Sequence, residues 1–169
     1  MPRRTDAGAG VTGCRAARAA DTLVVLACAP ARTPPAADST AVVTLRQATT
    51  QFLAAFDSLD WSRFAAVLSD TVDAYWPRPD SAEHLVNRAQ VEAQYRAFFE
   101  RIRATRPGPP YLHLNATGLA ARVIGPVGIV TFELSDVPDT VGRRTLVFRQ
   151  EGGRWRIIHL HASNLPRLE

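Results

Sequence analysis

The last third of the chain has the pattern of consecutive β-strands joined by tight turns. β-Branched and aromatic residues alternate with polar ones, which predicts strands over 111–124, 127–134, 143–150 and 154–163. Gly125-Pro126 and Gly152-Gly153 stand between two pairs of these strands as turn sequences. Consecutive strands with such short connections pair side by side, so this part of the chain predicts an antiparallel meander.

Three amphipathic helices are predicted upstream of these strands. Apolar residues recur at intervals of three and four over 39–59, over 61–68 and again at Val91, Tyr95, Phe98 and Ile102. Asn87 and Gln90 have the spacing of a capping box that opens the third helix. The stretch 71–76 reads as a first strand, and a loop is expected after it. Helices before and between strands, followed by a run of strands, predict an α+β fold.

The first 39 residues differ from the rest in composition. Residues 1–28 are basic and then apolar, and they end in Val25-Leu26-Ala27-Cys28, which resembles the end of a bacterial lipoprotein signal peptide. Residues 29–39 are rich in Pro and Ala and read as a flexible linker, and 40–169 as the folded domain. We expect export to the cell envelope, with membrane attachment only through a lipid on Cys28. A disordered cytoplasmic tail is the alternative.

The charge of the chain excludes several functions. All 20 basic residues are Arg, so lysine Schiff-base chemistry and a Walker-type phosphate loop are excluded. The formal net charge is +4, but four of the arginines fall within the first 20 residues. The others are spread without a run, and we expect no nucleic-acid partner. No segment approaches the ~20 continuous apolar residues of a membrane span.

Two segments carry a resemblance to a known family. Residues 144–163 contain the turn Gly153-Arg154-Trp155, followed by the pattern His-x-His-x-Ser that ends at Ser163. This ending, together with the sequence YLHLN at 111–115, is similar to the association domain of calcium/calmodulin-dependent protein kinase II. The chain from about 41 to 166 resembles the SnoaL-like, nuclear transport factor two-like family. Because that family contains isomerases, dehydratases, hydrolases and oligomerisation hubs, the resemblance predicts a fold and not an activity.

The resemblance implies a cone-shaped, curved antiparallel sheet with three N-terminal-half helices on its concave face and a pocket, without a cofactor. It places Tyr95, Val130, Leu146 and Ala162 at pocket positions. The association domain has three arginines and a histidine there, so their absence here argues against carboxylate binding in that style. Strand alternation independently predicts one apolar face, made of Val130, Phe132, Leu146, Phe148, Leu160 and Ala162. We expect a small, mostly apolar ligand with one oxygen that faces Tyr95.

The opposite face of the same strands is mixed in character. Alternation assigns to it Glu133, Arg149, Trp155, Ile157, His159 and His161. Such a mixture of polar and apolar side chains is typical of an interface. Since relatives of this fold commonly dimerise through the outer sheet face, we expect a homodimer with Glu133, Arg149, Ile157, His159 and His161 at the interface.

The sequence is compatible both with catalysis and with ligand binding alone. Tyr95 is a candidate acid. Its partner for proton transfer would have to be Asp73, Asp57, Tyr75 or His84. His159 and His161 point the same way on one strand, but His113 belongs to a distant strand, so no metal site is expected. The leading hypothesis is a ligand-binding envelope protein. The alternatives are a cofactor-independent isomerase, dehydratase or hydrolase, and a purely oligomerising module whose cone is filled by its own side chains.

Overall fold

The computed structural model describes residues 39–77, 82–135 and 140–166. The leader and the linker, including Cys28, lie outside the described residues. The described part has the expected α+β order of elements: α1 (Ser39–Asp57), α2 (Trp61–Ala66), β1 (Leu68–Pro77), β2 (Ala82–Leu85), α3 (Arg88–Thr105), β3 (Ala116–Ile124), β4 (Val127–Leu134), β5 (Thr140–Glu151) and β6 (Arg154–Pro166).

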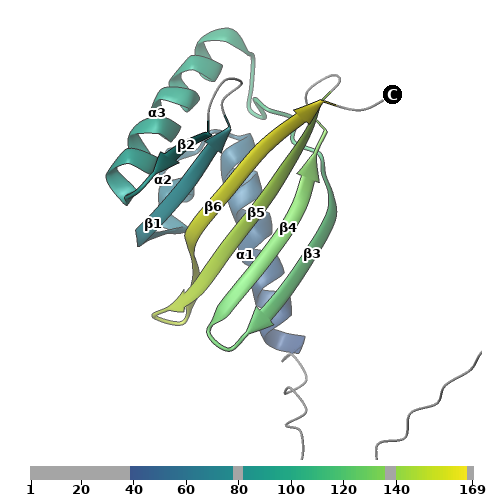
Figure 1. Ribbon diagram of the computed structural model, residues 1–169. Helices are drawn as coiled ribbons and strands as arrows, with labels where there is room; N and C mark the ends of the chain where they lie inside the picture. Colours follow the sequence, from purple (N-terminus) through teal and green to yellow (C-terminus); the bar gives the residue numbers. More distant parts are fainter. Residues whose placement is uncertain (1–38, 78–81, 136–139, 167–169) are drawn as a thin grey trace, which may run out of the picture. The chain divides into compact units, whose positions relative to one another are not determined.

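The strands form one curved, six-stranded sheet in the order β2-β1-β6-β5-β4-β3. Strands β3 to β6 pair antiparallel, which confirms the predicted meander. Strand β1 lies parallel to β6, and β2 pairs with β1 at the edge. The three helices lie together on one side of the sheet, with α1 behind the central strands and α3 beside β1 and β2 (Figure 1). The expected helix-covered, curved sheet is therefore confirmed.

Two details of the strand assignment differ from expectation. Strand β2 occupies part of the segment that was expected to be a loop. Its four residues are too few and too polar to give a periodic signal. Residues 111–115 are not a strand, because β3 begins only at Ala116 and His113 has a φ of 53°. His113 is an exposed loop residue, and its positive φ ends any extended run.

Local side chains explain where the helices begin. Asn87 Oδ1 accepts a hydrogen bond from the Gln90 amide at 3.0 Å, which confirms the capping box. Gln90 Oε1 accepts in return from the Val86 amide at 2.9 Å. Asp60 caps α2 in the same way, since its side chain accepts from the Arg63 amide at 3.0 Å.

The core lies between the helices and the inner face of the sheet. At Gly128 on β4, a Cβ would come within 2.7 Å of the Leu45 side chain, so glycine allows α1 to approach the sheet closely. Farther along α1 the core becomes aromatic. Phe64 of α2 is fully buried, and its ring lies 4.7 Å from Tyr95 and 5.2 Å from Phe99. Such a cluster provides rigid walls for whatever space remains.

The alternation expected along β6 is interrupted by a bulge. Val147 of β5 is opposite His159, but its neighbour Phe148 is opposite Ile157, so Ile158 is an extra residue on β6. Ile157 is fully buried and Trp155 is 7% exposed, and both belong to the core. Placing Trp155 and Ile157 on the outer face was therefore wrong. The bulge reverses the side on which they point, and Ile158 lies only partly buried.

No helix among the described residues is both long enough and apolar enough to cross a membrane.

Candidate functional site

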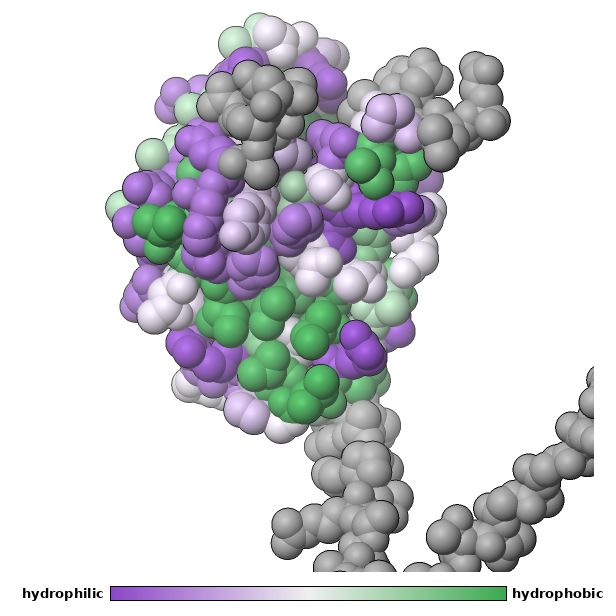
Figure 2. Space-filling model, viewed as in Figure 1, coloured by the Kyte–Doolittle hydropathy of each residue, from purple (hydrophilic) through white to green (hydrophobic). Residues whose placement is uncertain are grey.

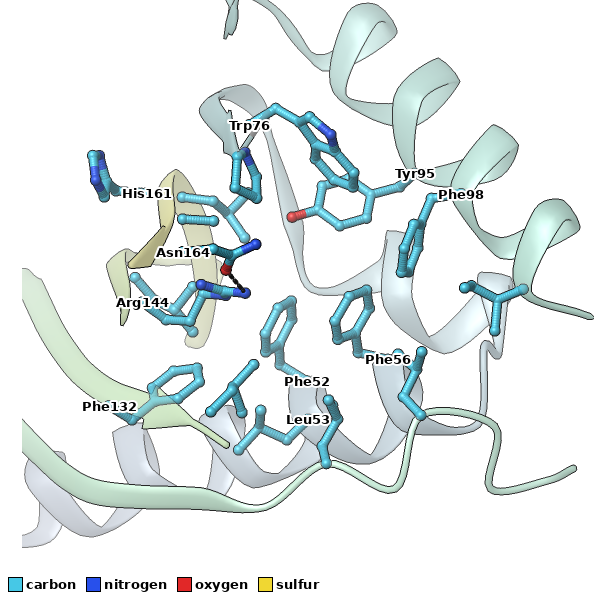
Figure 3. A pocket seen from close by; sticks show the side chains of 18 of the residues that line it. Phe52, Leu53, Phe56, Trp76, Tyr95, Phe98, Phe132, Arg144, His161 and Asn164 are labelled. Atoms are coloured by element: carbon cyan, nitrogen blue, oxygen red, sulfur yellow. Dashed lines mark hydrogen bonds between the residues drawn. The ribbon is translucent and has the colours of Figure 1, made fainter. Parts of the chain in front are cut away.

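The concave side of the sheet holds a cavity of about 260 Å³. Its walls come from three directions. Helix α1 contributes Phe52 and Phe56, helix α3 contributes Tyr95 and Phe98, and Trp76 lies at the end of β1. The sheet side is formed by Phe132, Leu134, Arg144, Leu146, Leu160, Ala162 and Asn164. Aromatic and aliphatic side chains therefore surround a small number of polar groups, as in most small-molecule sites (Figure 3).

Of the residues predicted for the pocket, Tyr95, Phe132, Leu146, Leu160 and Ala162 line this cavity. Val130 and Phe148 do not line it. Both are fully buried on the same inner face, in the hydrophobic core. The cavity is also not packed solid by Phe98 and Phe132, which stand in its wall. Five of the seven predicted pocket residues therefore line this cavity, and the other two lie in the core beside it.

Tyr95 is the most notable polar group of the cavity. Its side chain is 6% exposed, and its ring lies between Phe64 and Trp76, with centroids 4.7 and 4.9 Å away. The hydroxyl points into the open space (Figure 3). Among the residues that the structure describes, none hydrogen-bonds to it. Burial raises the pKa of Tyr95 to about 12, against the opposing positive charge of Arg144, so the phenol is protonated at neutral pH.

Arg144 is a second polar group in the wall, and sequence reasoning did not assign it there. Its guanidinium donates to the carbonyls of Arg143 and Ser163 at 2.9 and 3.0 Å and to Asn164 Oδ1 at 3.1 Å. Gly142 leaves room for it, because a Cβ at that position would meet the guanidinium nitrogen at 3.0 Å. The signal was present in the sequence. Residues two apart on a strand share a face, so the step from Leu146 back to Arg144 predicts the position.

The candidate acid partners of Tyr95 lie elsewhere. Asp57, at the end of α1, accepts a hydrogen bond from the Leu114 amide at 3.1 Å and so anchors the loop before β3. Asp73 points to the outer face of β1, where Val72 and Ala74 point inward and are buried. Neither carboxylate lines the cavity. The pairing of Tyr95 with Asp57 or Asp73 for proton transfer is therefore not formed in this structure.

Asp73 belongs instead to a cluster on the outer face. Its two carboxylate oxygens accept hydrogen bonds from His159 Nδ1 at 2.7 Å and from His84 Nε2 at 3.0 Å. Tyr75 stacks on His84 with ring centroids 4.5 Å apart, and it also contacts His159 and His161. Burial alone would raise the pKa of Asp73. The hydrogen bonds from His84 and His159 outweigh it and hold the pKa below its ordinary value.

His113 does not lie near the histidines of this cluster. Among the described residues there is no group of three or more His, Cys, Asp and Glu side chains arranged to hold a metal ion. His113 lies in the loop before β3, and β3 is three strands away from β6. His161 faces away from the cavity, although its backbone borders it (Figure 3).

The outer face of the sheet has two halves. An apolar patch, which we call the outer patch, lies near the β3–β4 turn and consists of Ile124, Val127, Ile129, Val147 and Ile158 (Figure 2). The other half carries Glu133 and His161. His159 and Arg149 border the patch, because His159 is opposite Val147 and Arg149 is opposite Val127. Arg149 also pairs with Glu151 within the chain. These four predicted interface residues lie on this face. Ile157, as described above, does not.

A second hollow lies between α1, α2 and the β5–β6 turn. Its volume of about 370 Å³ exceeds that of the cone, but its walls carry exposed polar side chains, with Gln47, Gln51, Arg63 and Arg154 among them. Surface arginines are well solvated there. The smaller cavity is the better candidate for a ligand, because its walls are apolar and its polar groups few.

Comparison with known proteins agrees with the fold described above. The family model for the SnoaL-like domain matches residues 45–167. A candidate dehydratase of the nuclear transport factor two-like family from Streptomyces avermitilis shares 20% identity, with a TM-score of 0.62 over 77% of this chain and 98% of that chain. A candidate calcium/calmodulin-dependent protein kinase type II association domain from Thiobacillus denitrificans shares 26% identity, with a TM-score of 0.55 over 72% and 95%.

A candidate ketosteroid isomerase from Parabacteroides distasonis shares 21% identity, with a TM-score of 0.55 over 72% of this chain and 87% of that chain. None of the curated proteins compared matches the chain. Structural similarity at these identities shows the fold alone. The family shown is that of the model, which matches residues 45–167 and so nearly the whole described domain. Because the family model covers residues 45–167 and the fold has the expected helix-covered sheet, the chain belongs to the SnoaL-like domain family.

Proposed function

We propose that this SnoaL-like domain binds a small, mostly apolar ligand in the cavity between α1, α3 and the sheet. The observation that supports this is the Tyr95 hydroxyl, which points into an aromatic cavity and has no partner among the described residues. Because no side-chain oxygen or nitrogen of the described residues is both buried and without a partner, this hydroxyl is accessible from the cavity and can donate to a ligand oxygen there. The cavity volume of about 260 Å³ suits a ligand of one or two rings.

Binding is favoured over proton-transfer catalysis by the lining of the cavity. Two similar structures are a candidate dehydratase and a candidate ketosteroid isomerase, and such reactions need a general base near the substrate. Among the described residues that line the cavity, none is Asp or Glu. Tyr95, with its raised pKa, is a hydrogen-bond donor rather than a base at neutral pH.

The test uses two probes that differ by one oxygen, 1-indanone and indane, titrated into the full-length protein by NMR or calorimetry. Wild type should bind indanone more tightly than indane. Tyr95→Phe should weaken indanone by about 0.5 to 1.5 kcal/mol, the net value of one hydrogen bond, and leave indane unchanged. Tyr75→Phe, on the outer face, is the control and should change neither. Failure of wild type to bind either probe would reject the proposal.

We also propose that the protein is a homodimer joined through the outer sheet face. The outer patch supports this, since five apolar side chains gather on one face and Ile124 is 63% exposed. One similar structure is a candidate association domain. A standard interface buries about 800 Å² on each partner, an area that one face of a sheet this size can supply.

Light scattering at micromolar concentration should therefore give the mass of a dimer. Ile158→Arg places a charge in the outer patch and should shift the protein to monomer. Thr50→Arg places the same charge on an exposed position of α1, on the opposite side of the sheet, and serves as the control. A wild-type monomer at high micromolar concentration would contradict the dimer.

The cell envelope remains the proposed location, on the basis of the leader that ends in Val25-Leu26-Ala27-Cys28. Expressed in a bacterium with its leader, the protein should be found in the membrane fraction with a lipidated Cys28 at its N-terminus. A Cys28→Ser variant should lose the lipid. A soluble product that retains the leader would reject this location.

A further inference from the structure

We propose that the second hollow, between α1, α2 and the β5–β6 turn, is a docking surface for an anionic membrane, at which Arg63 and Arg154 bind the phosphate groups of acidic phospholipids. The inference rests on the cell-envelope location in the proposed function, because it assigns the side of the domain that faces the membrane there. It does not depend on the ligand of the cone or on the dimer.

The lining of the hollow is basic. It includes Arg63 from α2 and Arg154 and Arg156 from the start of β6, and no Asp or Glu is among the described lining residues. Gln47 and Gln51 are four residues apart on α1, so they share one face of the helix and add amide groups that can donate. Arginine forks match phosphate oxygens in geometry and charge, and amide donors can complete such a site.

The guanidinium groups of Arg63 and Arg154 are available to a partner. Both side chains are exposed, and among the described residues neither guanidinium makes a hydrogen bond or an ion pair. Asp60, the acid nearest to Arg63 in the sequence, accepts from the Arg63 backbone amide as the cap of α2. Arg156 differs, because it is half-buried and interacts electrostatically with Glu151. The proposal therefore depends on Arg63 and Arg154.

The hollow lies at the end of the domain where α1 begins. The β3–β4 and β5–β6 turns also lie at this end, and Arg154 directly follows the second of these turns (Figure 1). Trp155 Nε1 donates to Thr44 Oγ1 at 3.0 Å, which joins the first turns of α1 to the start of β6. The basic side chains are therefore close to the point at which the chain enters the domain.

The length of chain before α1 is the next argument. Residues 29–38 lie between Cys28 and α1. Even fully extended, this segment spans at most about 36 Å, since each residue adds no more than about 3.6 Å. A lipid on Cys28 would hold the basic end near the bilayer, where a weak electrostatic contact forms at high effective concentration. Such a contact leaves the cone free, because Arg101 and Arg106 of its wall lie at the end of α3, toward the opposite end of the sheet.

The experiment measures vesicle binding of full-length Cys28→Ser protein, which carries no lipid of its own. Vesicles of phosphatidylcholine are compared with vesicles of phosphatidylcholine and phosphatidylglycerol in equal parts. At about 0.1 M salt the protein should bind the anionic vesicles more tightly, and high salt should remove the difference. Arg63→Gln/Arg154→Gln should weaken binding to the anionic vesicles about 10- to 30-fold, because each arginine at such a surface contributes about fivefold.

The matched control is Arg101→Gln/Arg106→Gln, which removes two exposed arginines from the opposite end and should change binding less than about twofold. All three proteins share the basic leader, so the leader cannot cause a difference between them. The inference is overturned if neither vesicle is preferred, or if the two double variants lose binding equally. Urea unfolding checks that both variants are folded, and the comparison of the two vesicles needs neither variant.

A free phosphate ester is the remaining occupant to be tested. If glycerol phosphate shifts the Trp155 indole N–H resonance while the protein shows no preference for anionic vesicles, the hollow binds a soluble phosphate and the membrane inference is overturned. Lipidation of Cys28 in wild type is measured separately. Absence of the lipid with a preserved preference for anionic vesicles rejects the proposed location and leaves the docking surface, whereas a lipidated protein without that preference does the reverse.

Discussion

The two sides of the sheet differ in how their polar side chains are hydrogen-bonded. On the outer face, Asp73 accepts hydrogen bonds from His84 and His159, and Tyr75 packs against both rings. On the inner side, the hydroxyl of Tyr95, which α3 places opposite the sheet, has no such partner among the described residues and points into open space. Groups that satisfy one another on an accessible face need no ligand. A donor that is accessible inside an apolar cavity can bind one.

The bulge at Ile158 makes this division possible on β6. Before it, Trp155 and Ile157 point inward and contribute to the core. After it, Leu160 again points inward, while His159 reaches Asp73 on the outer side. One extra residue therefore lets a single strand contribute to the core, to the cavity wall and to the outer cluster.

The largest effect that tests this division is on stability. Phe148 is fully buried on the inner face of β5, and Phe148→Ala should reduce the free energy of unfolding by about 3 to 5 kcal/mol. Thr145 is on the same strand but on the outer face and is only partly buried. Thr145→Ala should cost less than about 1 kcal/mol. Urea unfolding of both variants measures the difference, and equal losses would mean that the outer face is covered as fully as the inner one.

Much of this arrangement could be predicted from the sequence. Helical spacing located α1, α2 and α3, and alternation placed Leu146, Phe148 and Leu160 on the inner face. The same alternation also predicts the sides of the sheet on which two polar residues lie. Arg144 shares the face of Leu146, and Asp73 falls between the inward-facing Val72 and Ala74.

The bulge could not be read in the same way. Ile157 and Ile158 are both apolar, so their order contains no sign of which points inward, and the register is set by hydrogen bonds to β5. The partners of Asp57 were hidden for a related reason. Its contact with the Leu114 amide depends on how a distant loop closes, and no local pattern records it.

An intermediate effect is expected at alkaline pH and concerns Tyr95. Its folded pKa is raised from 10.0 to about 12, so the folded state favours the neutral phenol. The contribution of this pKa shift to the free energy of unfolding is fully present below pH 10. It is lost as the pH rises from 10 to 12, because Tyr95 ionises first in the unfolded chain. At pH 11 wild type should have lost about 1 to 1.5 kcal/mol from this source.

Urea unfolding at pH 8 and pH 11 measures this loss against Tyr95→Phe, which cannot ionise and should lack it. Tyr75→Phe keeps Tyr95 and should retain the full loss. An equal alkaline loss in wild type and Tyr95→Phe would show that the Tyr95 hydroxyl is in contact with water, and the contrast between the two faces would weaken.

The smallest effect is expected on the outer face, where Asp73→Asn removes the carboxylate that joins His84 and His159. Because the Asp73 side chain is 33% exposed, solvent screens the pair, and the loss of stability at pH 7 should stay below about 1 kcal/mol. The folded pKa of Asp73 lies below its ordinary value of 3.8, so its contribution to stability is present above pH 3.8 and disappears as the pH falls through the folded pKa. Urea unfolding should therefore give different stabilities for wild type and Asp73→Asn at pH 7 and similar stabilities near pH 2.

Binding of 1-indanone should be the same in wild type and Asp73→Asn, since the cluster and the cavity lie on opposite sides of the sheet. A loss of probe binding in Asp73→Asn would instead join the two faces into one functional unit.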